Sequence, residues 1–78
     1  MYYVATFHTH FGAISFKNKL ARLGDSPTMM PVPRVLSASC GTCVKFAKNF
    51  DRSTMYDEDI EKVFLESDGK FTVVFENE

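Results

Sequence analysis

The segment Met29-Met30-Pro31-Val32-Pro33 decides where one strand lies in the predicted sheet. Proline has no backbone N–H group, so a strand with two prolines is poorly suited to the middle of a sheet. Because Pro31 and Pro33 are two residues apart, both missing N–H groups fall on the same side of the strand. An edge strand with that side facing solvent loses no ladder hydrogen bond. We therefore expect residues 29–33 to form an edge strand.

The segments around this strand give the neighbouring elements. Residues 2–7 are aromatic and β-branched and too few for a helix, which predicts the first strand. Residues 43–48 alternate in polarity and predict the third strand, with Val44 and Phe46 on one face and Cys43 and Lys45 on the other. A helix is expected between the first two strands, ending at Gly24 and built on the apolar positions Ala13, Phe16, Leu20 and Leu23.

The last third of the chain completes the predicted fold. A second helix is expected after Thr54, with its inner face made by Ile60, Val63 and Phe64, and a final strand over residues 71–75. The order βαββαβ predicts a single α+β domain over residues 1–78 with the ferredoxin-like arrangement. That arrangement is a four-stranded antiparallel sheet of order 4-1-3-2 with both helices on one face.

The composition narrows the class of protein. The 78 residues are 45% apolar, include eight phenylalanines and carry a formal net charge of −1. This net charge does not suit a protein that binds nucleic acid through contacts with the phosphate backbone, so we expect no nucleic-acid partner. No apolar run is long enough to span a bilayer, and the first residues do not resemble a signal peptide, so no membrane partner is expected. These features predict a soluble cytoplasmic protein, where thiols stay reduced.

The stretch Ser39-Cys40-Gly41-Thr42-Cys43 carries the strongest functional signal. A disulfide between Cys40 and Cys43 would close too small a loop to stabilise the fold appreciably. The C-x-x-C spacing suits a reactive dithiol, a soft-metal site, or a nucleophile with a resolving partner. Gly41 lets the chain turn and bring its amide towards the sulfur. Arg34 is a nearby cation that would favour the thiolate, hold an anionic ligand or cap a loop carbonyl.

Two histidines are expected beside this stretch. In the predicted topology, the loop after the first strand and the loop before the third strand lie at the same end of the sheet. His8 and His10 occupy the first of these loops. Together with Cys40 and Cys43 they would supply a Cys2His2 set for a tetrahedral zinc ion, or they are solvated loop residues.

A resemblance sharpens this interpretation. The segment Met30-Pro31-Val32-Pro33-Arg34 followed by Ser37-Ala38-Ser39-Cys40-Gly41 resembles a bacterial family described as selenium/sulfur carrier protein-like, and the likeness extends over residues 2 to about 47. The resemblance implies that Cys40 carries sulfur or selenium as a persulfide or selenopersulfide. It implies that Arg34, Ser39 and Gly41 shape the loop, while Cys43 is less essential.

The resemblance also sets the expected partners. They are a sulfur or selenium donor, such as a cysteine desulfurase, and an acceptor protein. A carrier rather than a stand-alone enzyme is expected, without a cofactor. The alternative is a soft-metal module for zinc or copper that uses Cys40, Cys43 and His8 or His10. A dithiol redox protein is a third reading, although its usual thioredoxin-like scaffold is absent.

The remaining hypotheses concern the sheet surface. An RNA-binding βαββαβ domain would stack bases on Tyr2 or Tyr3 and Phe46, but the glycine-aromatic signature of the third strand is missing. An open sheet face with Tyr2, Val4 and Val74 would pair two subunits as a homodimer.

Overall fold

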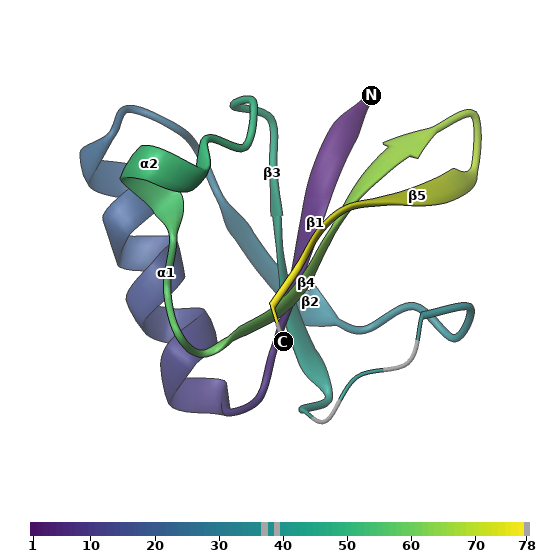
Figure 1. The fold of residues 1–78 in the computed structure, drawn as a ribbon, viewed down its shortest axis with the longest axis horizontal. Helices are drawn as coiled ribbons and strands as arrows, with labels where there is room; N and C mark the ends of the chain where they lie inside the picture. Colours follow the sequence, from purple (N-terminus) through teal and green to yellow (C-terminus); the bar gives the residue numbers. More distant parts are fainter. Residues whose placement is uncertain (37, 39, 78) are drawn as a thin grey trace.

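The computed structural model describes residues 1–36, 38 and 40–77 (Figure 1). One antiparallel sheet of five strands has the order β2-β3-β1-β4-β5. One long helix packs against it and one short helix joins β3 to β4. The elements are β1 (Tyr2–Phe7), α1 (His10–Arg22), β2 (Thr28–Pro31), β3 (Thr42–Phe46), α2 (Arg52–Met55), β4 (Ile60–Ser67) and β5 (Lys70–Glu76).

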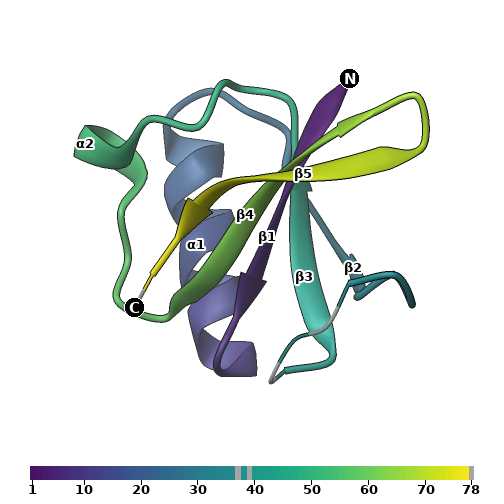
Figure 2. The ribbon, with the colours of Figure 1, turned by 45° about the vertical axis from the view of Figure 1, so that its right-hand side comes forward.

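The first half of the chain folds as its sequence predicts. Strand β1 spans the predicted residues, and α1 covers one face of the sheet (Figure 2). The helix ends at Leu23 because Gly24 takes a φ of +92°, a left-handed conformation that glycine adopts without a Cβ penalty. Strands β1 and β2 run parallel to each other, and β3 lies antiparallel between them.

The edge position of β2 is confirmed. Pro31 stands opposite Thr42, and the backbone N–H of Val32 donates to the Gly41 carbonyl at 3.1 Å. Strand β2 ends at Pro31, so Pro33 lies beyond the strand that was expected over residues 29–33. Since the Val32 amide points towards β3, the Pro31 nitrogen points away from it, and the missing donor of Pro31 costs the ladder nothing.

The core lies between the sheet and α1. Ala5 and Phe7 of β1 and Val44 and Phe46 of β3 are buried against the helix. Phe16 of α1 packs between the two aromatic rings, with ring centroids 5.3 Å from Phe7 and 5.5 Å from Phe46. Val44 and Phe46 thus share the helix-covered face, as their alternation predicts, and Cys43 and Lys45 belong to the opposite face.

The ferredoxin-like prediction of a four-stranded sheet with two full helices is wrong. Residues 60–67 form strand β4 beside β1, and the second helix is only the four residues of α2. The predicted last strand does form, as part of β5, but it pairs with β4 at the far edge of the sheet. In the described part of the chain, no helix is long and apolar enough to cross a membrane.

An irregularity in β4 explains the mistaken helix. Ile60 stands opposite Phe7 and Lys62 opposite Thr6, so Glu61 is an extra residue in the ladder. Ile60 and Val63 are therefore both buried in the same core although they are three residues apart. In a regular strand they would face opposite sides, and three-residue spacing otherwise indicates a helix.

The turn that follows β4 belongs to a hairpin. Asp68 and Gly69 have positive φ angles of 54° and 79° and connect β4 to β5 as a two-residue hairpin. An Asp-Gly pair is a strong signal for this type of turn. The segment Ser67-Asp68-Gly69 therefore lies between two paired strands, where the sequence had predicted one helix and one strand.

Candidate functional site

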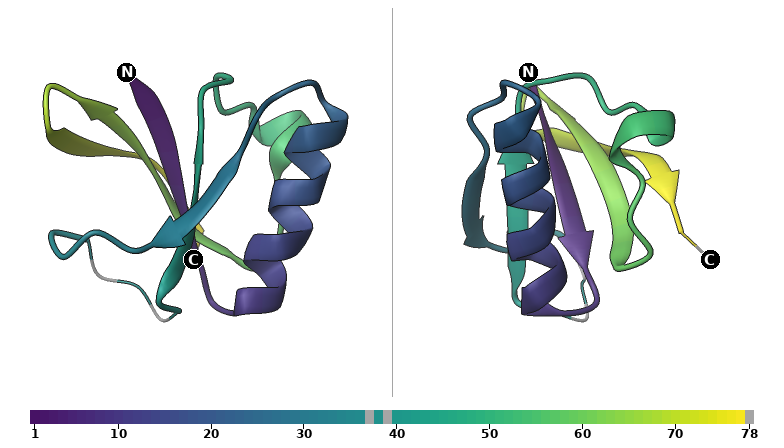
Figure 3. Two further views of the ribbon diagram at one scale, coloured as in Figure 1. Left: turned by 180° about the vertical axis from the view of Figure 1, so that it is seen from behind. Right: turned by 90° about the vertical axis from the view of Figure 1, so that its left-hand side faces the viewer.

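A connection joins β2 to β3, and its described residues 32–36, 38, 40 and 41 lie on the side of the sheet opposite α1 (Figures 1 and 3). Its two ends are held together by the Val32–Gly41 hydrogen bond described above and by the pairing of Pro31 with Thr42. A turn near its start is closed by the Leu36 N–H, which donates to the Pro33 carbonyl at 2.9 Å. Cys40 lies next to Gly41, one residue outside the part that the ladder holds.

Cys43 is fixed inside the sheet. It stands opposite Thr6 of β1 and Met30 of β2 and is fully buried. Its Sγ donates to the Pro31 carbonyl at 3.7 Å. Burial raises the pKa of the Cys43 thiol from 9.0 to about 11, because the thiolate would lose its hydration. Cys43 is therefore held as a neutral thiol at physiological pH.

Cys40 has a different setting. It lies in the connection before β3 and is only partly buried, and both cysteines are free thiols. No ladder pairing holds it. Of the two sulfurs, the one on Cys40 is the one that a reagent or a partner protein can approach without opening the sheet.

The other loop residues named from the sequence have mixed outcomes. Arg34 is exposed in the turn and makes no hydrogen bond or ion pair with another described residue. Gly41 does not take a left-handed φ, and a Cβ added there would meet nothing within 4 Å. Neither the backbone conformation nor the surrounding space therefore requires a glycine at position 41. Ser39 lies outside the described residues.

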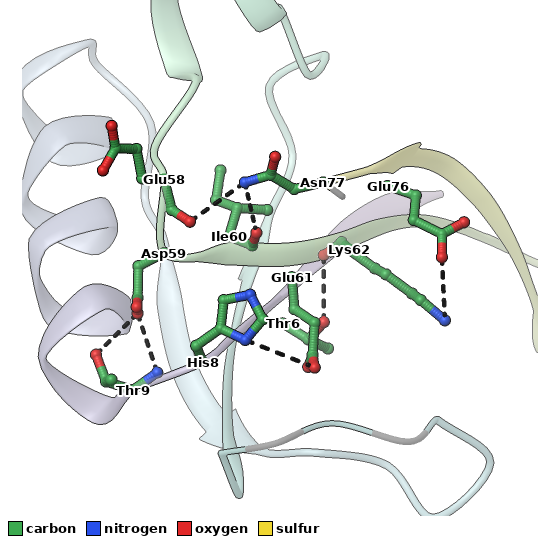
Figure 4. Close-up of polar contacts among 10 residues, drawn as sticks. All are labelled: Thr6, His8, Thr9, Glu58, Asp59, Ile60, Glu61, Lys62, Glu76 and Asn77. Carbon is green, nitrogen blue, oxygen red and sulfur yellow. Dashed lines mark hydrogen bonds and ion pairs between the residues drawn. The ribbon is translucent and has the colours of Figure 1, made fainter.

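The predicted neighbourhood of the histidines is confirmed for His10. Its Nδ1 lies 3.2 Å from the Thr42 hydroxyl, which places the start of α1 beside the first residue of β3. His8 turns to a different strand, with its Nδ1 3.8 Å from a carboxylate oxygen of Glu61 on β4 (Figure 4). The two histidines are thus two residues apart in the chain but contact different strands.

The junction between β1 and α1 depends on residues that the sequence interpretation missed. The Asp59 carboxylate accepts hydrogen bonds from the Thr9 N–H at 3.0 Å and the Thr9 hydroxyl at 2.8 Å (Figure 4). The same hydroxyl accepts from the Gly12 N–H at 3.1 Å and caps the helix. A Cβ on Gly12 would collide with the Asp59 carboxylate. Thr9 was recognisable as a cap by its place before the helix, whereas its partner is 50 residues away.

The hydrogen bonds of this junction tie together the two segments that it joins. At the start of α1, Thr9 caps the helix by accepting from the Gly12 N–H, and Asp59 holds Thr9 in place. The acidic residues 57–59 lie in the segment where the second helix was expected after Thr54, but they are not helical. They precede β4, where Asp57 accepts a hydrogen bond from the Asp59 N–H at 2.9 Å.

The geometry offers little to a metal ion. Among residues 1–36, 38 and 40–77, no group of three or more His, Cys, Asp or Glu side chains is placed to hold one. A Cys2His2 site would also require Cys43 as a thiolate, and its burial opposes that charge.

Comparison with known proteins adds one finding. The model of the family described as "Putative Se/S carrier protein-like" matches residues 2–68. Neither the curated proteins nor the solved structures gave a match.

Proposed function

The chain belongs to the Se/S carrier protein-like family, and on that premise we propose that it carries a sulfur or selenium atom on Cys40. The observation that supports this assignment is the unequal setting of the two cysteines. Cys43 is fully buried with a raised pKa, while Cys40 is partly exposed in a connection between strands. A carrier needs a sulfur that two different partners can reach in turn, and Cys40 fits that need.

The chemistry is a pair of thiol exchanges without net oxidation. The Cys40 thiolate attacks the outer sulfur of a donor persulfide, R–S–SH, and a new S–S bond forms as the old one breaks. The donor leaves as its thiolate, R–S⁻, and Cys40 becomes a persulfide. An acceptor thiolate then attacks the outer sulfur and releases Cys40 as a thiolate. With a donor R–S–SeH, the same steps carry selenium as a selenopersulfide.

The surrounding residues have supporting roles in this proposal. The exposed Arg34 guanidinium attracts the anionic donor and steadies the charge that develops during exchange. Thr42, held by His10, fixes the end of the loop next to Gly41 and Cys40. Ser39 belongs to the same loop through the family motif. Cys43 packs inside the sheet and takes no part in the exchange.

The partners are part of the same proposal. The donor is an enzyme that forms a protein-bound persulfide, such as a cysteine desulfurase, and the acceptor is a second protein with a reactive thiolate. Such exchange is favoured in the cytoplasm, where thiols are kept reduced.

Loading by a cysteine desulfurase and free cysteine, read by intact-mass spectrometry without reductant, tests the assignment. The wild-type chain is expected to gain one sulfur that a thiol reductant removes. Cys40→Ser should gain none, because a hydroxyl neither ionises near pH 7 nor accepts sulfur. Cys43→Ser is the matched control, with the same atom change three residues away, and should keep most of the loading.

Two outcomes would contradict the assignment. Equal loss of loading in both folded variants would show that Cys40 is not the sole acceptor. Retention of zinc by the wild-type chain, lost alike in both variants, would favour the soft-metal alternative, because each variant removes one ligand of four.

A further inference from the structure

Strand β5 forms one edge of the sheet and is built differently from β2 at the other edge. In the described part of the chain, no strand pairs with the outer side of β5. Its seven residues, Lys70–Glu76, contain neither proline nor glycine. Val73 and Val74 are 46% and 45% exposed. Val74 is an extra residue in the ladder with β4, a bulge that leaves residues 70–73 as the regular part of this edge. An exposed, apolar edge strand is a template for pairing with another strand.

The hairpin geometry shows which backbone groups are available. Asp68 and Gly69 make a two-residue turn, so Ser67 and Lys70 form the hydrogen-bonded pair that closes it. Hydrogen-bonded and non-bonded pairs alternate along an antiparallel ladder. The N–H and C=O groups of Phe71 and Val73 therefore point away from β4, towards the open edge.

We propose that β5 pairs antiparallel with β5 of a second copy of this chain, giving a two-fold dimer with one continuous sheet. The strand has a positive residue at its start, Lys70, and a negative residue at its end, Glu76, whose half-exposed carboxylate also lies 3.8 Å from the Lys62 ammonium of β4. Antiparallel pairing brings opposite charges towards each other, whereas parallel pairing would set like charges side by side. The strand is thus complementary to itself in the one orientation that a two-fold axis produces.

The other edge is less suited to extending the assembly. By the same alternation, Met29 and Pro31 face outward on β2, and Pro31 has no N–H group to donate. Pairing of β5 with β2 of a neighbour, which would generate an open-ended fibre, is therefore disfavoured. Because β2 and β5 lie at opposite edges of the sheet (Figure 3, right panel), the dimer leaves the Cys40 connection of each copy uncovered.

This interface differs from the sheet face expected from the sequence. Val4, one of the residues expected on that face, is fully buried within the chain. Tyr2 is covered by the Lys45 ammonium, which lies 4.1 Å from the centre of its ring. Only Val74 of the three expected contacts belongs to the β5 edge.

Sedimentation equilibrium over a range of concentrations tests the dimer. Wild-type chain is expected to approach twice the monomer mass as concentration rises. Val73→Lys should remain monomeric, because a lysine at the edge strand opposes pairing. Val35→Lys is the matched control: Val35 is also exposed, at 77%, but lies in the β2–β3 connection, so this variant should dimerise like wild type.

Amide hydrogen exchange locates the interface independently of any variant. The amides of Phe71 and Val73 should become protected as concentration rises, while that of Thr72, already bonded to β4, should exchange slowly at every concentration. A wild-type chain that stays monomeric throughout overturns the proposal. So does a dimer in which the exchange of Phe71 and Val73 does not depend on concentration, because its interface lies elsewhere.

Discussion

The two cysteines are three residues apart in the chain, yet the structure gives them opposite environments. Cys43 is inside the sheet, fully buried, with neighbours on both adjacent strands. Cys40 is in the connection before β3, partly buried and outside the ladder. The boundary between these environments is Thr42, where β3 begins.

The difference shows why a C-x-x-C spacing alone does not identify a dithiol site. When such a motif crosses from a loop into a strand, the pleat fixes the second cysteine on one face of the sheet. Here that face is buried, and the thiol that enters it loses the hydration a thiolate needs. Cys40 is then available for chemistry, whereas Cys43 is part of the buried face of the sheet.

Alkylation of the native chain should show the largest contrast between the two sites. With a pKa of about 11, Cys43 is ionised in roughly one molecule in ten thousand at pH 7, and its sulfur is also buried. We expect Cys40 to react with iodoacetamide at least about 100-fold faster than Cys43. A brief pulse with iodoacetamide, followed by digestion and peptide mass spectrometry, gives both rates.

The unfolded chain is the control for this contrast. In denaturant the two cysteines should react at similar rates, since burial no longer separates them. Similar rates in the native chain would instead show that Cys43 is accessible, and the distinction between the two sites would be lost.

The stability of the fold should depend on alkaline pH through Cys43. The pKa of the thiol has its ordinary value of 9.0 in the unfolded chain and is about 11 in the folded chain. As pH rises, the unfolded chain therefore loses this proton at a lower pH than the folded chain. Stability is therefore unaffected by this group below pH 9.0 and falls as pH rises towards 11. The difference of about two units between the unfolded and folded pKa values corresponds to a loss of about 2–3 kcal/mol in the free energy of unfolding.

Urea titrations at several pH values between 8 and 12 measure this loss. The informative quantity is the difference between variants, because it removes the contribution of every group other than Cys43. Cys43→Ala lacks the group and should show a flatter profile than wild type, whereas Cys40→Ala should keep the wild-type slope. A wild-type slope in Cys43→Ala would mean that burial does not raise this pKa.

The first half of the fold was predictable because its signals are local. The prolines gave the edge position of β2, alternation gave the faces of β3, and helical spacing with Gly24 gave α1. The second half contains one local signal, the Asp68-Gly69 turn, but the spacing of Ile60 and Val63 outweighed it because the extra residue Glu61 imitates a helix. The bulge at Glu61 exists only once β4 is paired with β1, so the sequence of β4 alone does not reveal it.

The site follows the same division. The Cys40 connection and its neighbour His10 were predictable from the order of strands, which places two loops at one end of the sheet. The burial of Cys43 depends on which face the rest of the chain covers. The contact between Thr9 and Asp59 joins residues 50 positions apart and follows from packing alone.

The smallest expected effect concerns the contact between His10 and Thr42, at the boundary between the two cysteines. This hydrogen bond is exposed, so its net contribution is about 0.5–1 kcal/mol, and removing it should slow sulfur loading of Cys40 by at most about fivefold. His10→Ala and Thr42→Val each remove the bond, but only the first removes the imidazole. Equal, small losses in the rate of loading, measured by intact mass against time, would show that His10 acts by holding the loop. A general base typically contributes about 100-fold or more. A loss of that size confined to His10→Ala would show that His10 acts on the Cys40 thiol itself.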